Sequence, residues 1–202
     1  MSRNIIAILR GLRPGEAVGI GRALVGAGIT RIEVPLNSPE PFDSIALLAE
    51  ALSGRAQIGA GTVLSAEDVE KVAAAGGTLI VSPDCNPAVI EATRAIGLAS
   101  YPGVATASEC FTALRHGANG LKLFPAFLIG TKGLAALRAV LPAGTETWAV
   151  GGVGLEDFAD WLAAGVTGFG VGSALYKPGL SADEVRARAE AMVAAYDAGL
   201  PG

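Results

Sequence analysis

The sequence predicts an α/β protein folded as a single (β/α)8 TIM barrel, with residues 1–202 forming one domain. Short apolar segments alternate with longer Ala-rich segments of helical period, and Gly, Pro or Asn stands at most junctions. The apolar segments are apolar on both faces, which is typical of parallel strands covered by helices. Eight such units leave about 25 residues for each, the least that this barrel needs.

An open, doubly wound sheet is the alternative architecture. Such sheets usually have about five or six strands, and the dinucleotide-binding type carries G-x-G-x-x-G after its first strand. The corresponding turn reads RGLRP over residues 10–14, and no change of composition marks a domain boundary. The barrel is therefore the favoured prediction.

The apolar runs give the strands, in chain order, and the segments of helical period that follow them give the helices. The predicted strands are residues 5–9, 31–35, 57–62, 78–82, 99–103, 120–124, 147–150 and 168–172. The predicted helices are residues 16–27, 41–52, 66–75, 87–96, 108–116, 133–140, 155–163 and 182–198. Ser65 and Ser181 each precede two acidic residues, which is the pattern of an N-cap followed by a first turn that complements the helix dipole.

Composition excludes several classes of protein. Hydrophobic residues make up 51% of the chain and charged residues 17%, so a disordered or fibrous chain is excluded. A net charge of −4 offers no attraction for nucleic acid or an anionic membrane surface. Mean hydropathy is +0.48, but the longest uncharged stretch, residues 161–176, contains four Gly and is too short for a membrane span. With two cysteines and no signal-peptide pattern, we expect a cytoplasmic protein.

Lys122 is the most informative residue at the predicted strand ends, where a barrel of this type carries its chemistry. It interrupts the apolar run GLKLF, and burying an ammonium group without compensation is costly. Burial lowers the pKa of a lysine, so Lys122 is a candidate to form an imine with a carbonyl substrate. A lysine on an edge strand that reaches solvent or pairs with an acid is the alternative.

Glu33 gives the same argument with the opposite charge. Ile32 and Val34 are expected to face the helices, so Glu33 points into the barrel because strand side chains alternate. Two opposite ionisable groups inside one barrel suggest a proton-transfer pair, and a structural salt bridge is the alternative.

Other strand ends supply groups that bind anions. Arg10 offers a guanidinium fork to a carboxylate or phosphate, and Thr62 offers a hydroxyl, although an exposed loop arginine and a turn-forming threonine are the alternatives. Glycines follow the last two strands, where phosphate-binding barrels hold their ligand with backbone N–H groups. These residues are Gly151, Gly152, Gly172 and, with a hydroxyl, Ser173.

Seven segments that span almost the whole chain carry a family resemblance. They are AILRG at 7–11, IEVPLNSP at 32–39, IGAGTVL at 58–64, PGVAT at 102–106, LKLFP at 121–125, AVGGV at 149–153 and GSALY at 172–176. In these segments and in their order, the chain resembles the 2-keto-3-deoxy-6-phosphosugar-acid aldolases. The resemblance implies a homotrimeric barrel enzyme that uses no metal and no cofactor and acts on a small phosphorylated keto acid.

The resemblance also implies roles for the candidate residues. Lys122 would form the imine with the substrate ketone, and Glu33 would transfer protons through a bound water. Arg10 and Thr62 would hold the carboxylate, and the products would be pyruvate and glyceraldehyde 3-phosphate. The four residues at the last two strands, Gly151, Gly152, Gly172 and Ser173, would hold the phosphate.

Three differences from the gluconate-type members favour a substrate of galactonate configuration. In those members, an arginine follows the strand that carries the glutamate, and a threonine precedes the Gly-Gly pair. This chain has Asn37-Ser38 and Val150 at these places and an arginine at position 10. Val150 cannot hydrogen-bond a C4 hydroxyl as a threonine could, a difference of about 1 to 3 kcal/mol.

One segment departs from the family pattern. Phe127, Leu128 and Ile129 follow the LKLFP segment and are either packed into the core or exposed as a contact between subunits or with a partner. Three functional alternatives stay open. They are an aldolase for the gluconate epimer or 4-hydroxy-2-oxoglutarate, a phosphate-binding isomerase in which Lys122 acts only electrostatically, and an aldolase-derived oligomeric scaffold.

Overall fold

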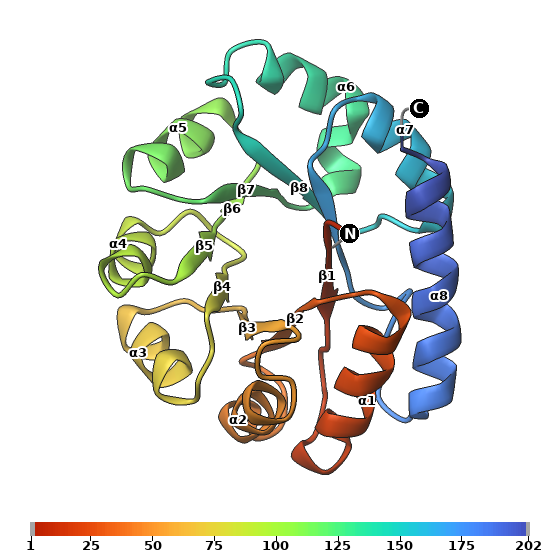
Figure 1. Ribbon diagram of the computed structural model, residues 1–202. Coiled ribbons are helices and arrows are strands. Elements are labelled where there is room, and N and C mark those ends of the chain that lie inside the picture. The colour runs from red at the N-terminus through yellow and green to blue at the C-terminus, as the bar shows by residue number, and fades with distance from the viewer. Residues whose placement is uncertain (1–2, 201–202) are drawn as a thin grey trace.

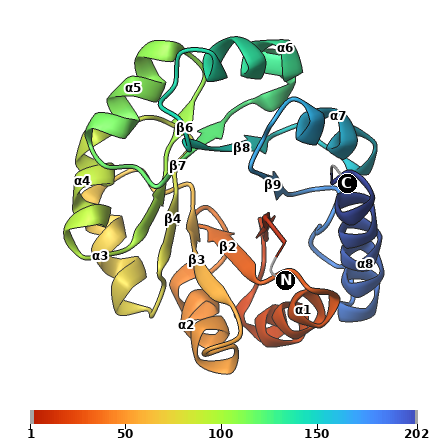
Figure 2. The same cartoon turned by 45° about the horizontal axis from the view of Figure 1, so that its top comes forward.

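A computed structural model describes residues 3–200 and shows a parallel barrel of strands inside a ring of helices, which confirms the predicted TIM-barrel fold (Figures 1 and 2). The strands within these residues are β1 (Ile5–Ile8), β2 (Arg31–Pro35), β3 (Gln57–Gly61), β4 (Leu79–Val81), β5 (Ala99–Tyr101), β6 (Gly103–Val104), β7 (Gly120–Leu123), β8 (Glu146–Val150) and β9 (Gly168–Val171). All of their pairings are parallel.

Pro102 splits the predicted strand 99–103 into β5 and β6, because proline has no N–H to continue the ladder. These two short strands stand at the ends of the sheet order β5-β4-β3-β2-β1-β9-β8-β7-β6. The barrel closes between β5 and β7, since the amides of Asn119 and Lys122 donate to the carbonyls of Ser100 and Pro102, each at 2.9 Å.

The helices are α1 (Pro14–Ala27), α2 (Pro41–Ala51), α3 (Ala66–Ala74), α4 (Pro87–Ala95), α5 (Ala107–Arg115), α6 (Ala126–Arg138), α7 (Phe158–Ala163) and α8 (Ala182–Ala198). A 3₁₀ turn, Leu155–Asp157, forms the start of the predicted helix 155–163. The predicted N-caps are confirmed, since the hydroxyls of Ser65 and Ser181 accept from the amides of Asp68 and Glu184 at 3.1 and 3.3 Å.

The predicted start of the sixth helix at residue 133 is wrong. Pro125 occupies the N-cap position of α6, and the helix begins seven residues earlier, at Ala126. Gly130, inside α6, has non-helical dihedrals (φ 65°, ψ 171°), so the helix consists of two segments that meet at a kink.

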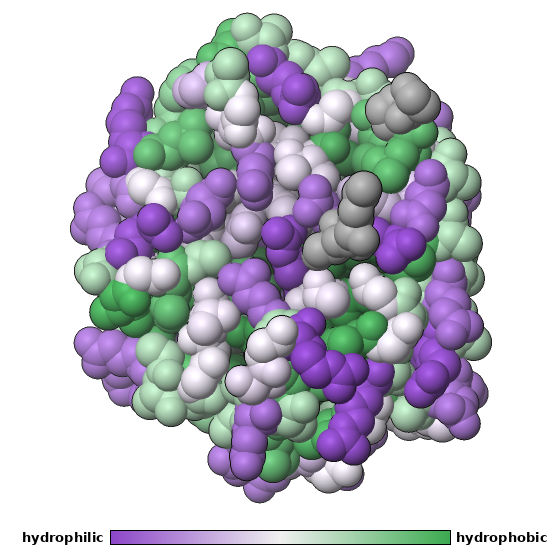
Figure 3. All heavy atoms as spheres, viewed as in Figure 1, coloured by the Kyte–Doolittle hydropathy of each residue, from purple (hydrophilic) through white to green (hydrophobic). Residues whose placement is uncertain are grey.

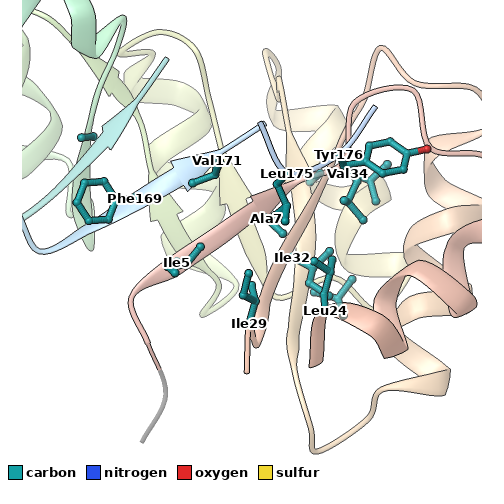
Figure 4. Close-up of a cluster of buried hydrophobic side chains, with 14 of the residues drawn as sticks. Ile5, Ala7, Leu24, Ile29, Ile32, Val34, Phe169, Val171, Leu175 and Tyr176 are labelled. Atoms are coloured by element: carbon teal, nitrogen blue, oxygen red, sulfur yellow. The ribbon is translucent and has the colours of Figure 1, made fainter. Parts of the chain in front are cut away.

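Strand side chains alternate between the helix layer and the barrel interior. Ile5 and Ala7 of β1, Ile32 and Val34 of β2, and Leu24 of α1 belong to one core cluster between strands and helices (Figure 4). The expected orientation of Ile32 and Val34 toward the helices is thereby confirmed, and Glu33 between them faces inward.

A second, smaller cluster fills the barrel interior. It consists of Ile6, Leu79, Val81, Tyr101 and Trp148, and Trp148 packs edge-to-face on Tyr101 with ring centroids 5.4 Å apart. Arg31 is the first residue of β2, and its guanidinium lies over the Trp148 ring, 5.1 Å from the ring centroid. These side chains fill part of the barrel interior, and a cavity lies beyond them at the strand ends.

Hydrophilic and hydrophobic side chains are interspersed over the face seen in Figure 3. Two apolar side chains of α6 are largely exposed, Phe127 by 65% and Leu128 by 72%, whereas Ile129 packs against the core. None of the helices within residues 3–200 is long and apolar enough to cross a bilayer.

Candidate active site

A cavity of about 700 Å³ opens at the C-terminal ends of the strands. It gathers every residue that the sequence nominated, from strand ends on both sides of the barrel. These residues are Arg10, Glu33, Thr62, Lys122, Val150, Gly151, Gly152, Gly172 and Ser173. The size and the mixed polar and apolar lining are those of a site for a small molecule.

Lys122 lies on β7, with its side chain directed into the cavity and only 7% exposed. Burial lowers the pKa of its ammonium group, and the positive charge of Arg10 lowers the pKa further. The negative charges of Glu33 and Asp84 act in the opposite direction. Lys122 is therefore neither an edge-strand lysine nor a solvated one, and its amine is available as a nucleophile at lower pH than a free lysine.

Glu33 lies on β2 and is 2% exposed. Burial raises the pKa of its carboxyl to about 7, although Lys122 and Arg10 oppose the shift. Within residues 3–200, no ion pair joins Glu33 to Lys122, and the Oε2 atom of Glu33 has no hydrogen-bond partner. The pair is not a structural salt bridge; a carboxyl with a pKa of about 7 faces the same cavity as an amine whose pKa is lowered by burial.

Glycines of the neighbouring strand create the space for Glu33. A methyl group on Gly61 would lie 2.0 Å from Glu33 Oε2, and one on Gly59 would overlap the backbone of Leu79. On the opposite side of the barrel, a methyl group on Gly170 would lie 2.7 Å from Val150. Inward glycines therefore set the shape of the cavity, a role that the sequence analysis did not assign to them.

Arg10 lies in a tight turn that Leu12 N closes on Leu9 O, with Gly11 in the left-handed region at φ 86°. Its guanidinium donates to Asn37 Oδ1 at 2.5 Å. Thr62 follows β3 and is itself left-handed at φ 57°, an uncommon conformation for a β-branched residue. Both residues line the cavity, and the charge of Arg10 acts on Glu33.

The glycines that follow β8 and β9 line the cavity with backbone groups. Gly151 and Gly152 are both left-handed, at φ 92° and 73°, which only glycine adopts at low cost. After β9, the amides of Leu175 and Tyr176 donate to the carbonyl of Gly172 and form a helical turn. The first amides of such a turn have no carbonyl partner within it, so they can donate to an anion.

The structure adds residues that sequence analysis missed. The Phe124 ring lies under the Lys122 ammonium, 4.7 Å from its centroid, and the ring lines the cavity. Lys177, Glu156 and Asp157 line the end near the glycines. The only sequence signal for them was proximity to the predicted strand ends. Within residues 3–200, no group of three His, Cys, Asp or Glu side chains is arranged to hold a metal ion.

The chain is similar to known proteins over most of its length. A family model described as KDPG and KHG aldolase matches residues 1–192. The chain is 52% identical to "Probable 2-dehydro-3-deoxy-6-phosphogalactonate aldolase" of Rhizobium meliloti (strain 1021), over 98% of this chain and 93% of that protein. It is 45% identical to "2-dehydro-3-deoxy-6-phosphogalactonate aldolase" of Escherichia coli (strain K12), over 95% and 94%. A solved structure described as "Native KDPGal structure" superposes with a TM-score of 0.96 at 43% identity, over 98% of this chain and 97% of that one.

Proposed function

The chain belongs to the KDPG and KHG aldolase family, and we propose that it cleaves 2-dehydro-3-deoxy-6-phosphogalactonate to pyruvate and D-glyceraldehyde 3-phosphate through an imine on Lys122. It is an aldolase, a carbon–carbon lyase. The observation that carries the proposed chemistry is the pair of buried groups, Lys122 and Glu33, that face one cavity with pKa values shifted toward neutrality.

Imine formation uses the free amine of Lys122. Its Nζ attacks the C2 ketone, the C–N bond forms, and the carbonyl oxygen leaves as water after two proton transfers. Because burial lowers the lysine pKa, the uncharged amine that attacks the ketone forms more readily than in a free lysine. The Phe124 ring below the nitrogen stabilises the positive charge of the protonated imine that results.

Carbon–carbon cleavage needs an electron sink and a base. Glu33 removes the proton of the C4 hydroxyl, directly or through a water; the C3–C4 electron pair moves into the protonated imine, and glyceraldehyde 3-phosphate leaves. The carboxylic acid of Glu33 then returns the proton to C3 of the enamine. Water hydrolyses the new imine and releases pyruvate. A carboxyl with a pKa of about 7 suits both directions of proton transfer.

The two ends of the cavity hold the two anionic ends of the substrate. Arg10 and Thr62 bind the carboxylate, which places the adjacent C2 ketone toward Lys122. Gly151, Gly152, Gly172 and Ser173 bind the phosphate through backbone N–H groups and a hydroxyl. Of the cationic side chains that line the cavity within residues 3–200, only Lys177 shares the segment of Gly172 and Ser173, so we assign it to the phosphate as well.

Val150 supports the galactonate configuration. It is 6% exposed, ends β8 and packs on Gly170, where it lines the cavity with a purely apolar surface. A C4 hydroxyl directed at this wall would lose its hydrogen bonds, so the wall favours the epimer whose hydroxyl points toward Glu33. We expect kcat/KM for the galactonate epimer to exceed that for the gluconate epimer at least tenfold. The reverse preference would contradict this assignment and leave the aldolase chemistry intact.

Trapping of the imine tests the proposed chemistry directly. Incubation with pyruvate and borohydride should reduce the imine to a stable secondary amine, and peptide mapping should find the added mass on Lys122 alone. Lys132 on α6, which does not line the cavity, is the internal control and should stay unmodified. An active enzyme that gives no adduct, or an adduct elsewhere, would show that Lys122 acts only electrostatically.

We also propose that the enzyme is a homotrimer and that Phe127 and Leu128 take part in contacts between subunits or with a further partner. Their exposure is large for apolar side chains, and the Phe127 ring lies over Gly152 at the phosphate end. Native mass measurement should give three chains. Replacing Leu128 by Ser should reduce the assembly if the patch is part of a subunit interface; an unchanged mass would assign the patch to another contact.

A further inference from the structure

Two consecutive residues of the loop after β2 hold the turn that carries Arg10. Asn37 Oδ1 accepts a hydrogen bond from Arg10 Nη1 at 2.5 Å, and Ser38 Oγ accepts one from Gly11 N at 2.9 Å. The guanidinium at one end of Arg10 and the peptide N–H that follows it are therefore both bonded to the same neighbouring loop.

The supporting loop is itself fixed. The Leu36 amide donates to Gly61 O at 2.8 Å, and the Ser38 amide donates to Pro35 O at 2.9 Å, so the segment is a hydrogen-bonded turn attached to β3. Ser38 is buried. A hydroxyl and an amide would not be needed at these two places for the turn alone, because both turn bonds use backbone atoms only.

We infer that Asn37 and Ser38 are positioning residues that pre-organise Arg10 to bind the substrate carboxylate. This inference rests on the proposed function. Arg10 is exposed at the cavity wall, and a free arginine side chain there would sample many rotamers that binding must then restrict. Because of the two bonds, Arg10 is already ordered in the folded protein, so substrate binding does not have to restrict it. The substrate then meets a guanidinium that already points into the cavity.

The Asn37→Asp variant gives the sharpest test. The introduced carboxylate would pair with Arg10, compete with the substrate carboxylate, and cancel much of the positive charge that acts on Glu33 and Lys122. Because Arg10 lowers the pKa of both groups, we expect the pH profile of kcat/KM to move to higher pH and KM to rise more than about tenfold. The other charges that face these two groups, including Asp84, stay unchanged.

Removal variants separate the two bonds. Asn37→Ala should raise KM about three- to tenfold with kcat changed less than about twofold, because only the order of the free arginine is lost. Ser38→Ala should have a similar effect, and Ser38→Thr, which keeps the hydroxyl, should restore most of the affinity. Circular dichroism and thermal unfolding check that each variant is folded.

Asn119→Asp is the matched control. Asn119 Oδ1 also accepts from an arginine, Arg94 Nη1 at 3.0 Å, but this pair lies outside the cavity, so KM and the pH profile should stay those of the wild type. The inference is overturned if Asn37→Asp lowers activity without moving the pH profile, or if it behaves like Asn119→Asp. A wild-type protein that forms no imine with pyruvate would instead contradict the proposed function, so the two failures are distinct.

Discussion

The two groups of residues that we propose to bind the anionic ends of the substrate differ in physical character. The proposed imine end contains buried ionisable side chains, Glu33 and Lys122, with Arg10 beside them. The proposed phosphate end contains glycine backbone at Gly152 and the turn at Ser173, both of which are exposed to solvent. Chemistry that moves protons needs pKa values shifted by burial, whereas holding a dianion needs only directed N–H groups.

This difference predicts where substitutions act. Changes to Lys122 and Glu33 should alter kcat and pH dependence, because they remove groups that act in the transition state. Changes at the phosphate end should alter KM for phosphorylated substrates and leave proton transfer unaffected.

Lys122→Met should have the largest effect. The variant keeps an apolar side chain of similar length but has no nucleophile, so we expect kcat/KM to fall roughly 10⁴-fold or more and the pyruvate adduct to disappear. Steady-state kinetics and borohydride trapping measure both. Turnover near the wild-type value would mean that no covalent step passes through this residue.

Glu33→Gln should come next. Glutamine fills the same space but transfers no proton, so we expect kcat to fall about 10²- to 10⁴-fold while pyruvate still forms a trapped imine. The acid limb of the wild-type pH profile, expected near pH 7, should be absent in the variant. If the limb persists, another group is the base.

The same carboxyl should make folding depend on pH. Its pKa is raised from 4.5 in the unfolded chain to about 7 in the fold, so the folded state binds more protons between these values. The free energy of unfolding should therefore fall as pH rises through this window, by on the order of 3 kcal/mol relative to Glu33→Gln. Urea titrations of both proteins at several pH values measure the difference. Parallel pH curves would show that Glu33 is already ionised at pH 5.

The placement of two ionisable groups in the cavity could be predicted from sequence because a charged residue inside an apolar strand has few explanations. Lys122 and Glu33 stood out in this way, and strand alternation alone directed Glu33 inward. The sequence gives no sign that Asn37 and Ser38 support Arg10. Their bonds to Arg10 and Gly11 join residues 27 positions apart, a pairing that no local pattern specifies. Lys177 resembled any surface lysine.

Glycines sharpen the comparison, because they serve different purposes at the two ends. At the imine end, a methyl group on Gly61 would collide with Glu33 at 2.0 Å; at the phosphate end, one on Gly172 would meet only Ile8, at 3.8 Å. Gly61→Ala should therefore cost about 1 to 3 kcal/mol of stability and most of the activity, whereas Gly172→Ala should leave stability nearly unchanged. Thermal unfolding and kcat measure both, and equal effects would contradict the distinction.

The fold itself was accessible from periodicity, and its deviations have local causes. The alternation of strands and helices, with apolar runs of strand length, predicted the barrel, because few other architectures bury so many parallel strands. Pro102 divided one strand by removing a ladder donor. Residues 126–129 formed a helical turn before a kink at Gly130, and nothing in the apolar run distinguished this turn from a loop.

Lys177→Met should have the smallest effect and the most selective one. The Lys177 side chain is solvent-exposed and forms no ion pair within the described chain. Its neighbours hold the segment in place: the Tyr176 hydroxyl donates to Glu16 at 2.8 Å, and Pro178 packs against Gly11. We expect KM for the phosphorylated substrate to rise about fivefold, because an exposed charge contributes modestly. Lys177→Arg should keep the affinity.

The unphosphorylated keto acid provides the contrast that gives this prediction its meaning. Its KM should be the same in the wild type and in Lys177→Met. Added salt should weaken binding of the phosphorylated substrate in the wild type more than in the variant, because salt screens the charge that the variant lacks. Lys132→Met, which removes a lysine outside the cavity, should change neither KM. A rise in KM for both substrates would instead place Lys177 at the carboxylate, and the separation of the cavity into two kinds of anion site would fail.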